Sequence, residues 1–255
     1  MMPRLRDALR SRRARRRWRR AATEAETAQA ATLARVLPAA REMAATAREL
    51  VQTAEARLHD HAAVRDAATV TAEWEWRPAP WSAPIRPGAV AGARDGTSLA
   101  AGVTLFHDCP LSEITLRQAR NVDGRSGAPY ALSLDVLGFE GSFLSLAMDL
   151  PGDAGRALRS GHLVEVSARI ALERAATIYA RLNLRHGPNV EQLLSALSGG
   201  DRPAGEMGGA FDLGLQEINP AKMEAAWLDL ILDDPGMNAL RIDDLVLTRR
   251  SRADL

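Results

Sequence analysis

The sequence is poor in several features that would define a class of protein. Cys109 is the only cysteine among 255 residues, which excludes an intramolecular disulfide framework and a zinc site of Cys/His spacing. No run of about 18 apolar residues occurs, so no ordinary membrane-spanning helix is predicted. The residues after Arg20 are Ala-Ala-Thr-Glu, which is too polar for the core of a secretory signal. We therefore expect a cytoplasmic protein.

Lysine is also nearly absent, because Lys222 is the only one and arginine supplies the remaining positive charge. Residues 1–20 hold ten arginines and one aspartate, a net charge of +9 in a chain whose total is +1, so the remainder carries −8. Such a cluster attracts polyanions, whether nucleic-acid phosphate or an anionic lipid surface. It has no base-reading motif. We interpret residues 1–21 as a solvated basic arm, disordered or frayed, and keep nonspecific contact of Arg4–Arg20 with an anionic surface as an alternative.

Residues 22–68 are rich in alanine, and apolar residues recur there at alternating spacings of four and three. The positions are Leu33, Leu37, Ala40, Ala44, Ala47, Val51, Ala54 and Leu58. This heptad pattern predicts a helical stem with a coiled-coil seam. Pro38 must either kink that helix or begin a second one. The seam of residues 30–58 could join copies into a homo-oligomer or pack on its own domain, and the sequence leaves both open.

Residues 69–95 contain Trp74, Trp76, Trp81 and several prolines. This composition cannot continue a helix or form a central strand. We interpret the segment as a Trp/Pro-rich linker whose rings hold it against the body. The alternative is that the rings stack on a ligand.

Residues 96–255 alternate between apolar and polar side chains, most clearly in His162–Glu173. This period of two predicts strands with one solvent-exposed face. The expected strands are Gly102–His107, Leu111–Ala119, Tyr130–Leu137, Ser142–Leu150, His162–Glu173, Thr177–Arg185, Ala210–Glu217, Ala226–Asp233 and Ala239–Arg249. Val190–Leu197 and Pro220–Ala226 are expected as short helical inserts, and Asp201–Gly209 as a glycine-rich loop. The pattern predicts a mainly β domain of two packed antiparallel sheets with an N-terminal α-helical extension.

Three segments of this domain resemble known strands. They are residues 142–151, residues 226–232 and the closing Leu-Arg-Ile-Asp-Asp-Leu-Val-Leu of residues 240–247. They look like strands of jelly-roll carbohydrate-binding modules of the galactose-binding-like type, which implies an antiparallel jelly-roll β-sandwich. The whole chain also resembles an alphaproteobacterial family of unknown function, with Trp-x-Trp-Arg-Pro at residues 74–78 and Arg-Leu-Asn-x-x-His-Gly-Pro-Asn at residues 181–189.

The strand positions opposite in parity to the apolar ones supply a candidate binding face. They hold Asp135, Tyr179, Arg181, Asn183, Trp227 and Asp229. If their strands are neighbours in one sheet, the rings can stack on the apolar face of a sugar while the polar groups bond its hydroxyls. The alternative is that the linker or the helix covers Tyr179 and Trp227 and that the charges form ordinary surface pairs. The binding face depends on the strand order, which the sequence does not give.

We predict no catalytic residues, no metal and no cofactor. No Gly-x-Ser-x-Gly, phosphate-binding glycine loop or His-Glu-x-x-His occurs, and we expect no Cys–His nucleophile pair among His107, Asp108 and Cys109. We expect His186 to cap or pack the turn at residues 186–189, and contact with a ligand is the alternative. The modules that the chain resembles often hold a structural calcium, for which Asp243 and Asp244 would be the candidates. The first hypothesis is a non-catalytic glycan-binding protein. The alternatives are a structural or oligomeric scaffold component, such as a phage-like particle spike or an envelope-associated assembly, and a protein tethered to a polyanion or membrane surface by its arginine-rich arm.

Overall fold

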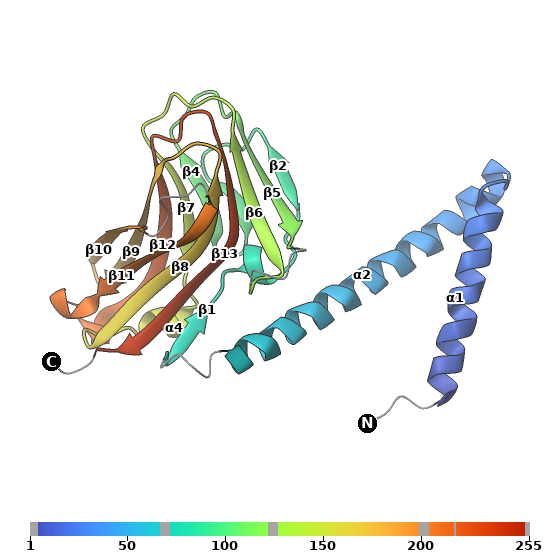
Figure 1. Ribbon diagram of the computed structural model, residues 1–255, viewed down its shortest axis with the longest axis horizontal. Helices are drawn as coiled ribbons and strands as arrows, with labels where there is room; N and C mark the ends of the chain where they lie inside the picture. The colour runs from blue at the N-terminus through green and yellow to red at the C-terminus, as the bar shows by residue number, and fades with distance from the viewer. Residues whose placement is uncertain (1–4, 67–71, 122–126, 199–203, 217, 253–255) are drawn as a thin grey trace. The chain divides into compact units, whose positions relative to one another are not determined.

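The computed structural model describes residues 5–66, 72–121, 127–198, 204–216 and 218–252. The chain divides into two compact units, residues 1–53 and residues 54–255, and the second holds all the described strands (Figure 1). Among the described residues, no helix is long and apolar enough to cross a membrane.

The first unit consists of α1 (Leu5–Ala25) and the larger part of α2 (Ala30–Asp66). Alanine and arginine are the commonest residues of both segments, and both have high helix propensity. The arm that we expected to be disordered or frayed is therefore helical from Leu5 onward. Pro38 lies inside α2, so no second helix begins there, and the break in the expected stem falls at residues 26–29 instead.

The second unit contains two antiparallel sheets, which we name A and B. Sheet A has seven strands in the order β11–β8–β13–β6–β5–β2, with β1 paired to β13. Their bounds are β1 (Trp74–Trp76), β2 (Ala89–Ala91), β5 (Ile114–Arg120), β6 (Tyr130–Val136), β8 (His162–Leu172), β11 (Ala204–Asp212) and β13 (Asn238–Ser251). Sheet B has six strands in the order β10–β9–β12–β7–β4–β3. Their bounds are β3 (Thr97–Ala100), β4 (Val103–His107), β7 (Leu144–Asp149), β9 (Thr177–His186), β10 (Asn189–Ala196) and β12 (Met223–Asp233).

The chain crosses repeatedly between the sheets, since β4, β7, β9 and β12 lie in sheet B and β6, β8, β11 and β13 in sheet A. All described strand pairs are antiparallel. The predicted core positions are buried between the sheets: Leu132, Leu134, Val136, Leu144, Leu146, Met148, Ile178, Ala180, Leu182, Leu184, Leu228, Leu230 and Leu232. The predicted antiparallel jelly-roll β-sandwich is confirmed.

Residues 72–95 pack against the sandwich as part of it. Trp81 lies on the short helix α3 (Ala79–Ser82), is 0% exposed, and donates its indole N–H to the carbonyl oxygen of Ile242 at 2.9 Å. The rings of Trp74 and Trp76 stack with centroids 6.4 Å apart and pack on the core. Because β1 pairs with β13 and β2 with β5, this segment extends sheet A.

Two predictions of local structure are wrong. Val190–Leu197, expected as a helical insert, lies mostly in β10, which pairs with β9 across a turn at Gly187 (φ +64°). Residues 204–209 of the expected glycine-rich loop belong to β11, whereas residues 201–203 lie outside the described residues. Glycine leaves room for the neighbouring strand here, because a Cβ on Gly209 would lie 2.7 Å from the hydroxyl oxygen of Ser195 and would require that side chain to shift.

Smaller differences concern the ends of elements. The strand expected to run to Glu217 ends at Asp212, after which the chain makes the 3-10 turn η2 (Leu213–Leu215). The other expected insert is a single 3-10 turn, η3 (Pro220–Lys222), which leads into β12. A further short helix, α4 (Gly152–Arg156), follows β7.

Candidate functional site

Five of the six predicted site residues lie on two neighbouring strands. Tyr179, Arg181 and Asn183 belong to β9, and Trp227 and Asp229 to β12, the next strand of sheet B. The register places Arg181 opposite Asp229 and Asn183 opposite Trp227. Alternation turns these side chains away from the core, which their neighbours Leu182 and Leu228 enter.

We call the outer face of sheet B the B face. It is defined by Phe106, Ser145, Tyr179, Arg181, Asn183, Trp227, Asp229 and Ile231.

The structure does not bring Asp135 to this face. Asp135 lies on β6 in sheet A, where its carboxylate is 3.8 Å from a guanidinium nitrogen of Arg117. Both side chains are partly exposed, at 31% and 59%. Asp135 shares only its parity with the other candidates, because alternation along a strand identifies a face but not the sheet to which the strand belongs.

A hydrogen-bonded polar cluster lies at the centre of the B face. Two N–H groups of Arg181 donate to one carboxylate oxygen of Asp229, at 2.9 and 2.7 Å. The side-chain amide of Asn183 donates to the same oxygen at 2.9 Å, and Gln192 of β10 donates to the amide oxygen of Asn183 at 3.1 Å. Asn183 is fully buried and the Asp229 side chain is 6% exposed. Three donors thus fix the Asp229 carboxylate in one position.

Arg181 is the open end of this cluster, with its side chain 36% exposed. A guanidinium carries five N–H donors, and two of those of Arg181 are bonded to Asp229. The remaining donors can reach an acceptor that approaches the B face from solvent. The cluster therefore presents oriented donors to a ligand without leaving its buried carboxylate unpaired.

Partly exposed rings flank the cluster. Tyr179 and Trp227 are both partly exposed, and Phe106 on β4 is 40% exposed. The register connects Phe106 to Ser145, Ser145 to Ile231 and Ile231 to Tyr179 in one row across four strands. Three strand spacings separate the two rings at the ends of this row, about 14 Å in all. Phe106 is a member of this face that was not predicted, because only the strand order shows which residues share its row.

Ser145 gives the face an unpaired polar atom. The residue is 6% exposed, and its hydroxyl oxygen is buried without a hydrogen-bond partner among the described residues. An unpaired buried hydroxyl costs about 1–3 kcal/mol. Ser145 lies between Phe106 and Ile231 in this row, but protein atoms cover its oxygen, so a ligand on the B face does not reach it.

The Trp/Pro-rich segment does not cover this face within the described residues. Its strands β1 and β2 pair with β13 and β5, both in sheet A. Trp81 points into the core and bonds to β13. The alternative in which the tryptophans roof Tyr179 and Trp227 is thereby removed for residues 72–95.

The aspartates considered for calcium are engaged separately. Asp243 accepts from Arg241 at 2.7 Å and Asp244 from Arg77 at 2.8 Å. In the part of the chain that the structure describes, no group of three or more His, Cys, Asp or Glu side chains lies where it could hold a metal ion.

The histidines and the cysteine that we considered lie apart from the B face. A ring nitrogen of His107 lies 3.0 Å from the carbonyl oxygen of Ala93, and its Nδ1 accepts from the backbone N–H of Cys109 at 3.2 Å. His186 is buried, with Nε2 3.8 Å from a carboxylate oxygen of Glu191. Neither histidine is a member of the B face.

Three groups outside the B face have displaced pKa values. The hydroxyl of Ser142 and the backbone N–H of Phe143 lower the pKa of Asp108 by hydrogen bonding. Ser251 lowers the pKa of Glu73 in the same way. Burial, with Arg249 nearby, lowers the pKa of His162. Each shift thus follows from local bonding or burial in the sandwich.

Comparison with protein families identifies the chain over its whole length. A family model described as a family of unknown function (DUF6478) matches residues 1–255. The chain belongs to the DUF6478 family. This confirms the resemblance to a family of unknown function, while the alphaproteobacterial origin stays a prediction. No curated protein sequence matches this DUF6478 member.

Solved structures with some similarity to this DUF6478 member include a domain of tailspike protein 4 of bacteriophage CBA120, described as enzymatically active. Its TM-score is 0.40 at 9% identity, covering 57% of this chain and 19% of that one, so this chain spans about a fifth of it. The CBM22-1 xylan-binding domain of Paenibacillus barcinonensis Xyn10C has a TM-score of 0.35 at 12% identity. That match covers 65% of this chain and 94% of the xylan-binding domain. The family 11 carbohydrate-binding module of Clostridium thermocellum, in complex with a mixed-linked tetrasaccharide, has a TM-score of 0.36 at 11% identity. That match covers 60% of this chain and 92% of the module.

Proposed function

We propose that this DUF6478 protein is a non-catalytic β-sandwich protein that binds a glycan on the B face. One observation carries the proposal: Tyr179 and Trp227 flank a cluster in which Arg181, Asn183 and Asp229 are held in fixed positions by hydrogen bonds. A sugar presents an apolar ring face and a rim of hydroxyls. The B face offers partners for both at once.

The spacing of the rings favours an oligosaccharide over a single sugar. Phe106 and Tyr179 stand about 14 Å apart across sheet B, and the polar cluster lies beside the Tyr179 end of that row. A chain of several sugars can reach both rings, whereas one sugar can stack on only one.

Isothermal titration against oligosaccharides selected on a glycan array tests this proposal. We expect the Tyr179→Ala, Trp227→Ala double variant to bind at least ~10-fold more weakly than wild type, since each stacked ring contributes on the order of 1 kcal/mol or more. Asp135→Asn is the matched control, because Asp135 lies in sheet A, and it should leave affinity unchanged. Thermal unfolding checks that each variant is folded. Equal binding by wild type and double variant would remove this site.

The remaining hypotheses concern the helices. Self-association through residues 30–58, as in a scaffold component, stays a prediction, and so does the cytoplasmic location. Attachment of Arg4–Arg20 to an anionic surface is supported by the exposure of Arg16, Arg17, Arg19 and Arg20. These hypotheses do not depend on the glycan proposal.

A further inference from the structure

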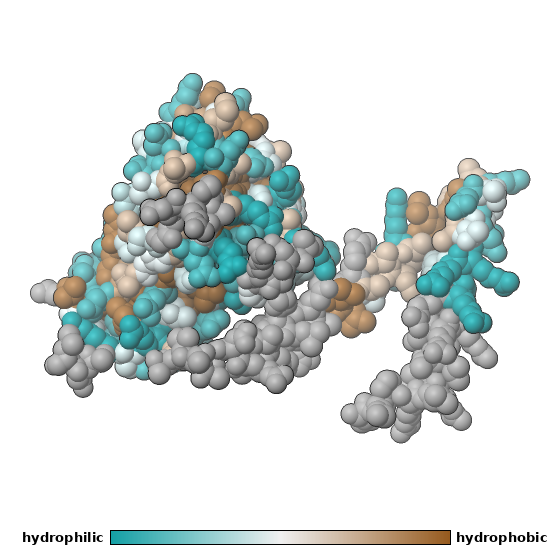
Figure 2. All heavy atoms as spheres, in the orientation of Figure 1, coloured by the Kyte–Doolittle hydropathy of each residue, from teal (hydrophilic) through white to brown (hydrophobic). Residues whose placement is uncertain are grey.

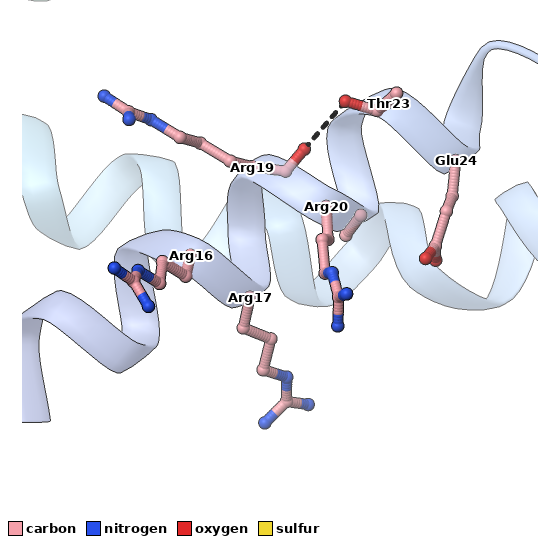
Figure 3. Close-up of a pocket in the computed structure, with 7 residues that line it drawn as sticks. Arg16, Arg17, Arg19, Arg20, Thr23 and Glu24 are labelled. Atoms are coloured by element: carbon pink, nitrogen blue, oxygen red, sulfur yellow. Dashed lines mark hydrogen bonds between the residues drawn. The ribbon is translucent and has the colours of Figure 1, made fainter.

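The described part of α1 has a basic side and an apolar side. At 100° per residue, Arg16, Arg17, Arg19 and Arg20 fall within one half of the helix, and Trp18 falls opposite their centre. Figure 3 shows these four arginines with Thr23 and Glu24 around a hollow on the helix surface. Arg17 and Arg20 extend in the same direction there.

No described carboxylate forms an ion pair with these arginines. The interaction drawn in Figure 3 joins the Thr23 hydroxyl to the backbone carbonyl of Arg19 at 3.2 Å, so it leaves the guanidinium groups unoccupied. Arg181 of sheet B differs from these arginines, because its guanidinium forms an ion pair with the carboxylate of Asp229. Four exposed cations therefore remain on one short stretch of helix.

The apolar side of α1 forms a groove with the first turns of α2. The groove has a volume of about 360 Å³ and is lined by Trp18, Ala21, Ala22, Ala25, Leu33, Val36, Leu37 and Ala40. Its aliphatic side chains are not covered, since Leu33, Val36 and Leu37 are 38%, 41% and 46% exposed. Figure 2 shows hydrophobic side chains beside the hydrophilic ones on these two helices.

The apolar stripe continues along α2 beyond the groove. Met43, Leu50 and Val51 lie on the same side of the helix as Leu33 and Leu37, at 51%, 70% and 46% exposure. Monomeric soluble proteins rarely leave so long an apolar strip in water. The two helices thus present a continuous apolar surface next to a dense positive charge.

An occupant of this surface must satisfy both features. Nucleic acid would neutralise the arginines but leave the apolar stripe in water. A second copy of the chain would cover the stripe but bring another set of unpaired arginines close to the first. An anionic lipid surface accepts both, because its hydrocarbon boundary takes up leucine, valine and tryptophan while its headgroups pair with arginine.

We infer that α1 and residues 30–51 of α2 form a docking surface for an anionic lipid membrane. The stripe enters the boundary between headgroups and acyl chains. Trp18 lies at the level of the headgroups, where tryptophan is enriched. Arg17 and Arg19, at the edges of the basic half, extend toward lipid phosphates along their own aliphatic stems.

Vesicle co-sedimentation of the full chain at low salt tests the inference, with phosphatidylcholine vesicles made with and without phosphatidylglycerol. We expect binding only with phosphatidylglycerol present, and a steep loss of binding as salt is raised. Arg17→Gln with Arg19→Gln should weaken binding by roughly 25-fold, since each arginine near anionic lipid strengthens it about fivefold. The matched control, Arg117→Gln with Arg185→Gln, removes two exposed charges from the sandwich and should change binding less than ~2-fold.

The apolar contribution has its own variants. Leu33→Gln with Leu37→Gln should weaken binding at least ~10-fold. Leu50→Gln is the second variant, because Leu50 is 70% exposed and its replacement leaves the helix pair intact; it should weaken binding less. Far-ultraviolet circular dichroism confirms helix content in both.

Three results would overturn the inference. The first is the absence of binding to phosphatidylglycerol vesicles. The second is tighter binding to a DNA or RNA oligonucleotide than to these vesicles, with no effect of Leu33→Gln and Leu37→Gln. The third is a stable dimer in mass photometry that the same two changes dissociate. None of these results bears on glycan binding by the sandwich, which is measured separately.

Discussion

The sandwich and the helical unit treat the same residue types in opposite ways. Leu182 and Leu228 of sheet B are 0% exposed, whereas Leu50 and Met43 of α2 are 70% and 51% exposed. Two sheets can cover each other's apolar sides completely, but two helices that meet along part of their length cannot. The apolar surface of the sandwich is therefore used in folding, and that of the helices remains available to a partner.

The charged groups of the two regions also differ in whether they have a partner of opposite charge. In the sandwich, Arg181 pairs with Asp229 and Arg77 with Asp244. In α1, Arg16 and its neighbours have no described carboxylate partner. Charges of the sandwich hold side chains in place, whereas those of α1 remain available for contact. Four matched pairs of variants test this contrast, each comparing one position in each region.

Leucine truncation should give the largest difference. Leu228→Ala removes a fully buried side chain from sheet B and should lower the free energy of unfolding by about 2–5 kcal/mol. Leu50→Ala in α2 should change it by less than about 0.5 kcal/mol. Urea denaturation followed by tryptophan fluorescence measures both. Similar losses in the two variants would show that the stripe on α2 is packed in solution.

Arginine removal should give the next largest effect. Arg181→Gln leaves the Asp229 carboxylate, 6% exposed, with Asn183 as its remaining side-chain donor. Breaking a buried pair costs about 3–5 kcal/mol, and because Arg181 is 36% exposed we reduce this to roughly 1–3 kcal/mol. Arg16→Gln should have no effect on unfolding beyond about 0.5 kcal/mol. The same urea denaturation experiment measures the free energy of unfolding of both variants. An Arg181→Gln variant as stable as wild type would mean that Arg181 does not hold the Asp229 carboxylate in place.

The sequence predicted the core because alternation is a local property. Every apolar residue of residues 178–184 and 228–232 on the predicted inward parity is buried. Strand order is not local, so the neighbourhood of β9 and β12 and the exclusion of Asp135 from the B face could not be predicted. The row from Phe106 to Tyr179 was missed for the same reason, since its residues come from four strands.

β10 shows where the pattern itself is ambiguous. Leu193 and Leu197 are four residues apart, a spacing that fits one face of a helix and one face of a strand equally well. Residues 189–196 form a strand because they pair with β9 and contact β11, and both leucines are buried. In β11 the glycines indicated a loop, but Gly209 is a strand residue whose hydrogen side chain makes room for Ser195.

Tryptophan replacement should give a smaller effect. Trp81→Phe removes the indole N–H that donates to Ile242 and leaves a small space in the core. We expect a loss of about 1–1.5 kcal/mol in the free energy of unfolding. Trp18→Phe, in the groove of the helical unit, should leave that free energy unchanged. Calorimetric melting temperatures check both, and an unchanged Trp81→Phe variant would contradict the anchoring role of this ring.

The smallest effect is expected from removing a hydroxyl that bonds a carboxylate. Asp108 accepts from the Ser142 hydroxyl at 2.6 Å, and this bond is the main cause of its lowered pKa. A lowered folded-state pKa stabilises the protein above the unfolded value of about 3.9, and that stabilisation is lost as the pH falls through the folded-state pKa. Ser142→Ala should therefore raise the pKa of Asp108 toward its ordinary value and flatten the dependence of stability on pH in the acid range. The backbone N–H groups of Ser142 and Phe143 still bond Asp108, so the shift should not vanish.

Thr23→Ala is the counterpart in α1, because the Thr23 hydroxyl bonds only a carbonyl of its own helix. It should change neither a carboxyl pKa nor the acid limb of the unfolding curve. NMR titration of the side-chain carboxyl carbons measures the pKa of Asp108 in wild type and both variants. If Ser142→Ala leaves that pKa where it is, the backbone N–H groups alone hold the carboxylate. The contrast between bonded groups in the sandwich and unbonded ones in the helices would then rest on Arg181 and its cluster.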